Sequence, residues 1–148
     1  MTTQLDTLPK RLQAMAQKYG HQRVALREKD YGIWQETTWQ GYLDEVRDFC
    51  LGLVAMGFER GDKVAIVGDN RPEWVIAEVA AQSAGGTSVG IYQDSLAKEM
   101  AYVIDNCEAK ALFADTRVAG AAEAAGQCPQ LKLRVSIGGD LPGFMPYE

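Results

Sequence analysis

The sequence predicts an α/β fold, in which an N-terminal helix and β-hairpin precede a mostly parallel sheet flanked by helices. Three observations lead to this prediction. The 148 residues are 47% hydrophobic and 24% charged, as in a globular domain with a real core. The first third contains helical patterns with apolar residues on one face. After Asp62, short apolar runs alternate with helical segments, which is typical of parallel sheets with right-handed crossovers.

The N-terminal part begins with a predicted helix over residues 7–19. Thr7 can cap this helix, and Gly20 can end it. Two short strands over residues 23–28 and 33–37 follow, and the four residues between them form the turn of a hairpin.

The second helix has the clearest pattern in the sequence. Thr38 is a suitable N-cap, and apolar residues recur at three- and four-residue spacing for four turns after it. Gly57 provides a natural stop.

The remainder is predicted to alternate between strands and helices. The strands lie over residues 63–68, 87–92, 111–114 and 131–137. The helices lie over residues 72–84, 95–106 and 116–125. Asn70 is expected to cap the first of these helices with Glu73 completing a capping box, and Ser95 is expected to cap the second. Residues 138–148 read as a loop.

Composition excludes several classes of function. The net charge of −5 and a pI of about 4.9 argue against a nucleic-acid-binding surface. Three widely spaced cysteines and a single histidine favour neither a disulfide framework nor a zinc site, so no metal ligand is assigned. No apolar run is long enough for a transmembrane segment, and no secretory signal is evident. The sparse thiols suit a reducing environment, which favours a cytoplasmic protein.

Ligands of open parallel sheets bind beyond the carboxyl ends of the strands, next to helix N-termini. In this chain those positions are residues 68–71, 92–95, 115–116 and 138–140. Asn70 and Arg71 precede a helix whose free N–H groups could hold an anion, and Arg71 could add a charge for a phosphate. The alternative is purely structural: Asn70 caps, Asp69 and Asp94 form turns, and Arg71 is solvated. No glycine-rich phosphate-loop motif is present.

Four segments together resemble the opening of bacterial long-chain acyl-CoA synthetases, which are AMP-forming enzymes of the adenylate-forming superfamily. They are LREKDYGIWQETTW (26–39), RGDKVA (60–65), GDNRPEW (68–74) and GIYQDSL (90–96). The resemblance extends over about residues 7–114, and it is specific because the segments occur in this order and spacing.

The resemblance implies a reaction in which a fatty acid and ATP, with Mg2+, form an acyl-adenylate and pyrophosphate, after which coenzyme A (CoA) takes the acyl group. It implies that Ile91, Tyr92, Gln93 and Asp94 border the CoA channel. Residues 1–148 would be the first part of the large N-terminal domain. The family's ATP-phosphate loop, magnesium-binding glutamate and catalytic lysine lie further downstream, so no catalytic residue is assigned here.

We therefore expect this chain alone to be inactive and to bind none of these cofactors tightly. The alternative functions are a stand-alone CoA- or nucleotide-binding regulatory module and an unrelated small α/β protein. The helix over residues 72–84 is apolar nearly all round, and in a fragment part of its surface would lose its cover. Such a surface, with open sheet edges, favours a homodimer or swapped oligomer. The resemblance also adds the inner face of the membrane as a peripheral location.

Overall fold

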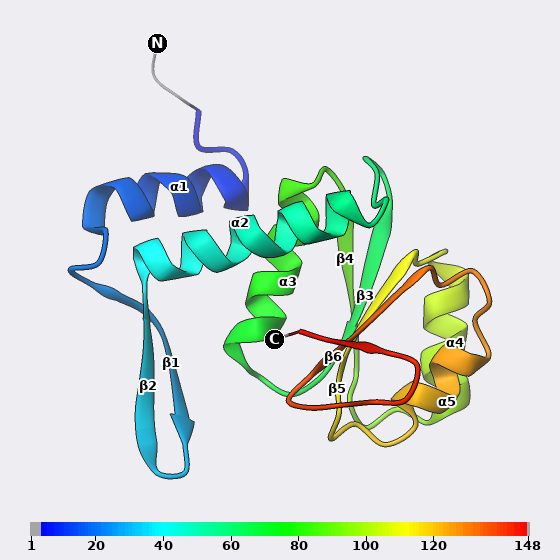
Figure 1. Cartoon of the computed structure of the whole chain (residues 1–148). Helices are drawn as coiled ribbons and strands as arrows, with labels where there is room; N and C mark the ends of the chain where they lie inside the picture. Colours follow the sequence, from blue (N-terminus) through cyan, green and yellow to red (C-terminus); the bar gives the residue numbers. More distant parts are fainter. Residues whose placement is uncertain (1–3, 148) are drawn as a thin grey trace.

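The computed structural model describes residues 4–147, which form five helices and two sheets (Figure 1). The helices are α1 (Leu8–Tyr19), α2 (Trp39–Ala55), α3 (Pro72–Ser83), α4 (Ala97–Asn106) and α5 (Ala121–Gly126). The strands are β1 (Val24–Asp30), β2 (Ile33–Thr38), β3 (Lys63–Val67), β4 (Thr87–Ile91), β5 (Ala111–Asp115), β6 (Leu133–Ile137) and β7 (Met145–Pro146).

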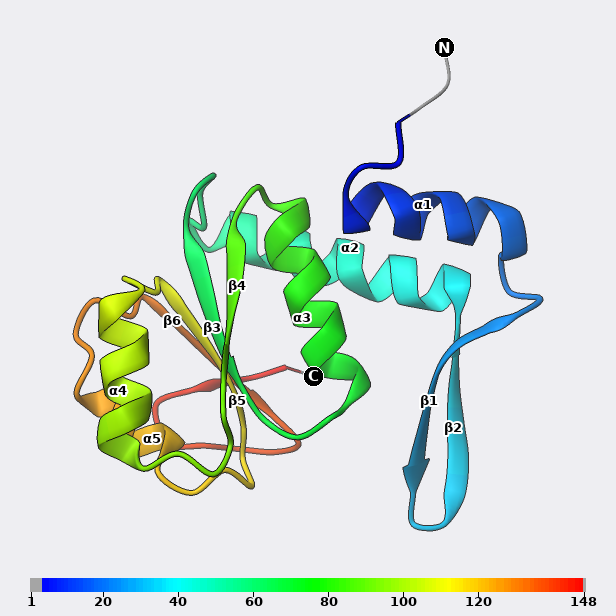
Figure 2. The same cartoon turned by 180° about the vertical axis from the view of Figure 1, so that it is seen from behind.

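The larger sheet has the strand order β4-β3-β5-β6-β7, and every pair in it is parallel. The chain steps from β3 to β4 in one direction and then returns past β3 to β5. This reversal is the switch point at which open α/β sheets form a crevice. Helices α2 and α3 cover one face, with α1 packed against both of them, whereas α4 and α5 cover the other (Figures 1 and 2). The predicted parallel sheet flanked by helices is confirmed.

Helix α3 is buried on two sides, as its sequence predicts. Ala77 and Ala81 pack with side chains of β3, β5 and β6, and Ile76, Val79 and Ala80 pack with α1 and α2. The expectation that α3 would expose apolar surface is wrong, because these two helices and the sheet cover it.

One group of exposed apolar side chains lies on the β1–β2 hairpin. This antiparallel pair extends away from the rest of the chain (Figure 1). Tyr31, Ile33 and Trp34 near its tip are 97%, 65% and 59% exposed. Both strands run further than predicted, so that only Tyr31 and Gly32 remain in the turn.

Two predicted helix caps are wrong by one residue. The N-cap of α3 is Arg71 rather than Asn70, and no side chain caps it, because the Glu73 carboxylate accepts hydrogen bonds from Arg71 instead of completing a capping box. The N-cap of α4 is Leu96 rather than Ser95, and its N–H donates to the Glu99 carboxylate at 2.8 Å.

The chain after β5 also differs from the prediction. Helix α5 begins at Ala121 instead of residue 116, because residues 116–120 form a turn in which the Asp115 carboxylate accepts the Arg117 N–H at 2.9 Å. The predicted C-terminal loop contains β7, which pairs with β6. Tyr147 holds this segment in place by packing its ring against Phe49 and Phe113.

Candidate functional site

A surface depression of about 610 Å³ lies at the carboxyl ends of β3, β4 and β5. Asp69 follows β3, Gln93 and Asp94 follow β4, and Asp115 with Arg117 closes the β5 side. The first turns of α4 and α5 complete the lining. The site therefore occupies the position that the switch point of the sheet predicts.

Asp115 is the buried charge of this site. It is 1% exposed, and Arg117 donates to both of its carboxylate oxygens, at 3.1 Å from Nε to Oδ1 and 2.7 Å from Nη2 to Oδ2. Arg117 itself is 60% exposed and also lies 3.8 Å from the Asp69 carboxylate. Arg117 thus links the ends of β3 and β5 across the depression.

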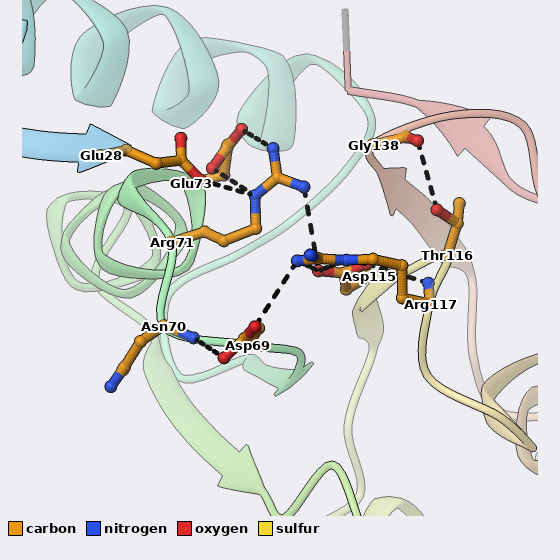
Figure 3. Close-up of polar contacts among 9 residues, drawn as sticks. All are labelled: Glu28, Asp69, Asn70, Arg71, Glu73, Asp115, Thr116, Arg117 and Gly138. Atoms are coloured by element: carbon orange, nitrogen blue, oxygen red, sulfur yellow. Dashed lines mark hydrogen bonds and ion pairs between the residues drawn. The ribbon is translucent and has the colours of Figure 1, made fainter. Parts of the chain in front are cut away.

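Arg71 forms a second link, between the sheet and the hairpin (Figure 3). Its guanidinium lies 3.0 Å from the Glu73 carboxylate, 3.4 Å from Glu28 of β1 and 3.9 Å from Asp115. Three acidic neighbours already surround this cation, which opposes the role of phosphate ligand that the sequence suggests for Arg71. That role, and the anion site at Asn70, stay predictions.

The pKa of Asp115 reflects these contacts. Burial alone would raise the pKa of this carboxyl, but hydrogen bonds from the side chain and N–H of Arg117, with the charges of Arg117 and Arg71, lower it below its ordinary value. The same contacts raise the pKa of Arg117. Both groups are therefore ionised at neutral pH.

Charge in the lining is mostly negative. Four carboxylates line the depression, from Asp69, Asp94, Asp115 and Glu123, and Arg117 is the one basic residue among the lining residues. The lining contains neither a histidine nor a cysteine that could serve as a base or nucleophile. The depression can therefore hold a ligand between carboxylates and one guanidinium.

The residues expected to border a CoA channel are separated by the structure. Gln93 and Asp94 line the depression, whereas Ile91 is buried in the core beneath α4. Tyr92 is 86% exposed beside them and does not line the depression. Asn70 is exposed, and Arg71 faces the carboxylates described above.

Arg117 and Glu28 are site residues that the sequence reasoning missed. Arg117 comes directly after Asp115 and Thr116, which follow a predicted strand. Its position in the sequence therefore indicates that it lies at the same edge of the sheet. Glu28 lies on a hairpin 43 residues before Arg71, and no local pattern indicates that the two side chains meet.

Residues 4–147 contain no cluster of metal-ligating side chains, no disulfide and no helix that could span a membrane. No group of three or more histidine, cysteine, aspartate or glutamate side chains is placed there to hold a metal ion. Cys50, Cys107 and Cys128 are free thiols. Every helix in the described part of the chain is too short or too polar to cross a membrane.

Comparison with known proteins agrees with the fold. The chain is 34% identical over 116 residues to the long-chain-fatty-acid–CoA ligase FadD15 of Mycobacterium bovis, a match that covers 77% of this chain and 19% of the relative. It is 35% identical over 103 residues to an uncharacterized protein of Mycobacterium tuberculosis, covering 70% of this chain and 58% of that protein. A crystal structure of a putative long-chain-fatty-acid CoA ligase from Rhodopseudomonas palustris superposes with a TM-score of 0.83 at 23% identity, covering 95% of this chain and 35% of the other.

The match therefore involves only part of such ligases, since this chain spans less than a fifth of the length of the first curated relatives. The family model for AMP-binding enzymes matches residues 12–143. The chain belongs to the family of AMP-binding enzymes.

Proposed function

We propose that this chain is the first part of the large N-terminal domain of a long-chain fatty acid–CoA ligase. The observation that carries the proposal is the identity of 31–36% with several proteins named long-chain-fatty-acid–CoA ligases, over 70% or more of this chain in the first matches. Membership of the AMP-binding family supports adenylate-forming chemistry, because AMP is the nucleotide that such a reaction joins to the acyl group.

The proposed reaction has two steps. The fatty acid carboxylate attacks the α-phosphorus of ATP, which forms acyl-AMP and releases pyrophosphate. The CoA thiol then attacks the acyl carbonyl, loses its proton, and releases AMP. Both steps develop negative charge on oxygen atoms, which needs preorganised donors or cations. We place those groups, including the ATP loop and the Mg2+ ligands, in a longer polypeptide outside residues 1–148.

The proposed role of this part is structural support and a border for the CoA channel. Gln93 and Asp94 offer polar side chains in the depression. Ile91 is the last residue of β4, and Tyr92 joins it to these two lining residues. Arg117 is the lining cation that a CoA phosphate would approach.

The charge of the lining argues against tight binding of CoA by this chain alone. Four carboxylates and one guanidinium line the depression, whereas CoA is a polyanion. Arg117 is also already paired with Asp115 and Asp69. We infer that the remaining positive charge needed by CoA comes from other parts of the ligase.

A thioesterification assay tests this proposal. The purified 148-residue chain and the longer polypeptide encoded by the same frame are each given palmitate, ATP, Mg2+ and CoA. We expect pyrophosphate release and palmitoyl-CoA only with the longer polypeptide. Product formation by the short chain would contradict the inactivity of this part, and no product from a well-folded longer polypeptide would contradict the ligase assignment.

A second candidate is a stand-alone module that binds CoA or a nucleotide without catalysis. It is favoured by the uncharacterized Mycobacterium tuberculosis relative, because the match to this chain covers 58% of that protein. Isothermal titration of the 148-residue chain with CoA distinguishes the two functions. Micromolar binding supports the module, and no binding supports the ligase part.

A further inference from the structure

Strand β4 leaves one edge of the parallel sheet open. It pairs with β3 on one side only, and it lies at the end of the sheet between α3 and α4 (Figure 2). The Thr87 N–H donates to the Asp62 carbonyl at 3.0 Å, so the backbone of Thr87 faces β3. Because backbone groups alternate along a strand, those of Ser88 and Gly90 face outward. No hydrogen bond from residues 4–147 reaches these outward groups.

This edge lacks the features that usually prevent strand pairing. Its sequence, Thr-Ser-Val-Gly-Ile, has no charge and no proline, and its register with β3 is continuous without a bulge. The other end of the sheet is different, since β7 has two residues and one of them is Pro146. Of the two edge strands of this five-stranded sheet, only β4 lacks features that prevent pairing with another strand.

We propose that the β4 edge is a self-association site at which β4 of a second copy of this chain pairs antiparallel across a two-fold axis at Val89. In this register Ser88 lies opposite Gly90 of the partner subunit, and each of the two positions exchanges an N–H···O=C pair. All five residues of β4 are then paired. A centre at Ser88 or Gly90 would also align outward groups, but it would leave the ends of the strand unpaired.

Side chains on both faces suit this register. Ser88 and Gly90 point to the α3 face, where the Trp74 ring lies over Gly90 and would be 3.2 Å from a Cβ at that position, so only a glycine fits beneath the ring without displacing it. Val89 points to the α4 face and is only half-buried. At the centre of the pair it would contact Val89 of the partner subunit, with Cα atoms about 4.5 Å apart, as in a non-hydrogen-bonded antiparallel pair. The proposal does not depend on any catalytic role for the chain.

Sedimentation velocity over about a hundredfold range of chain concentration tests the proposal. We expect the unmodified chain to dimerise. Ser88→Pro removes an outward N–H without touching the ladder to β3, and Val89→Lys sets two like charges opposite each other at the axis. Each variant is expected to weaken dimerisation by at least about tenfold. The matched control Val54→Lys places the same charge on α2, where Val54 is 50% exposed, and should leave the dimer intact.

A cross-linking variant keeps the test informative if a substitution unfolds the chain. Val89→Cys should form an intermolecular disulfide under mild oxidation, because directly opposed non-hydrogen-bonded positions lie within disulfide reach. Val54→Cys should not. A monomer at every concentration without cross-linking through position 89 would overturn the proposal, as would a dimer that Val89→Lys and Ser88→Pro leave unchanged.

Discussion

Replacing Asp115 by asparagine is expected to destabilise the fold far more than the same change at Asp69. Both carboxylates lie near Arg117, at 2.7 Å for Asp115 and 3.8 Å for Asp69. They differ in exposure, since the side chain of Asp115 is 1% exposed and that of Asp69 is 57% exposed. The two substitutions therefore compare a buried carboxylate with a solvated one, each paired with the same exposed guanidinium.

The expected magnitude follows from burial and hydrogen bonding. Asp115→Asn turns an amide donor or a neutral oxygen toward the Arg117 guanidinium and leaves Arg71 with one carboxylate fewer. Loss of the charge-assisted hydrogen bond at this buried acceptor should lower the free energy of unfolding by about 2 kcal/mol. This value already takes into account that Arg117 is largely exposed to solvent. For a domain of this size the melting temperature falls by about 4–8 °C. Asp69→Asn should cost less than about 0.5 kcal/mol.

Thermal unfolding followed by circular dichroism measures both variants, and its pH dependence adds a second test. The pKa of Asp115 in the folded chain lies below its unfolded value, so its stabilisation is complete above the unfolded pKa and is lost as pH falls. The difference between the unmodified chain and Asp115→Asn should be full at pH 7 and shrink below about pH 4. Equal melting temperatures for the two variants at pH 7 would refute the stabilisation assigned to the buried Asp115 carboxylate.

Two further predictions concern the hairpin and the sheet. Glu28→Gln removes the link from β1 to Arg71, so amides of β1 and β2 should exchange hydrogen up to about fivefold faster by mass spectrometry, since a half-buried pair contributes about 1 kcal/mol. Glu36→Gln, on the exposed side of the same hairpin, should change exchange less, and equal effects would argue against the link. Gly86→Ala should lower the melting temperature by about 10 °C or prevent folding, because its Cβ would lie 2.5 Å from the Asp62 carbonyl oxygen. Gly126→Ala meets no atom within 4 Å and should fold normally, so similar melting temperatures for the two variants would contradict this packing.

Much of the fold could be predicted because local patterns and burial agree. The apolar run of β3 and the all-round apolar character of α3 both indicate elements covered on two sides, and both are buried as expected. Local pattern was insufficient where a distant contact decides the structure. The C-terminal segment that forms β7 is held by the packing of Tyr147 onto Phe49, about a hundred residues away. A pattern read over a short stretch of sequence cannot reveal such a contact.

For the candidate site, the sequence predicts the location but not the pairing of its charged side chains. Its location follows from topology, since polar residues after parallel strands gather at one edge of the sheet. The pairing of its charges does not follow, because Arg71 was expected to be free and instead lies among Glu28, Glu73 and Asp115. Its partners come from three separate elements, so their convergence depends on the tertiary structure.

Sequencing the source DNA past the codon for Glu148 tests the proposed ligase function most directly. We predict that the reading frame continues into a Ser/Thr/Gly-rich, lysine-containing loop of the kind that holds ATP phosphates in the family. A native stop codon directly after Glu148 would contradict the ligase function for this protein and would favour the stand-alone binding module.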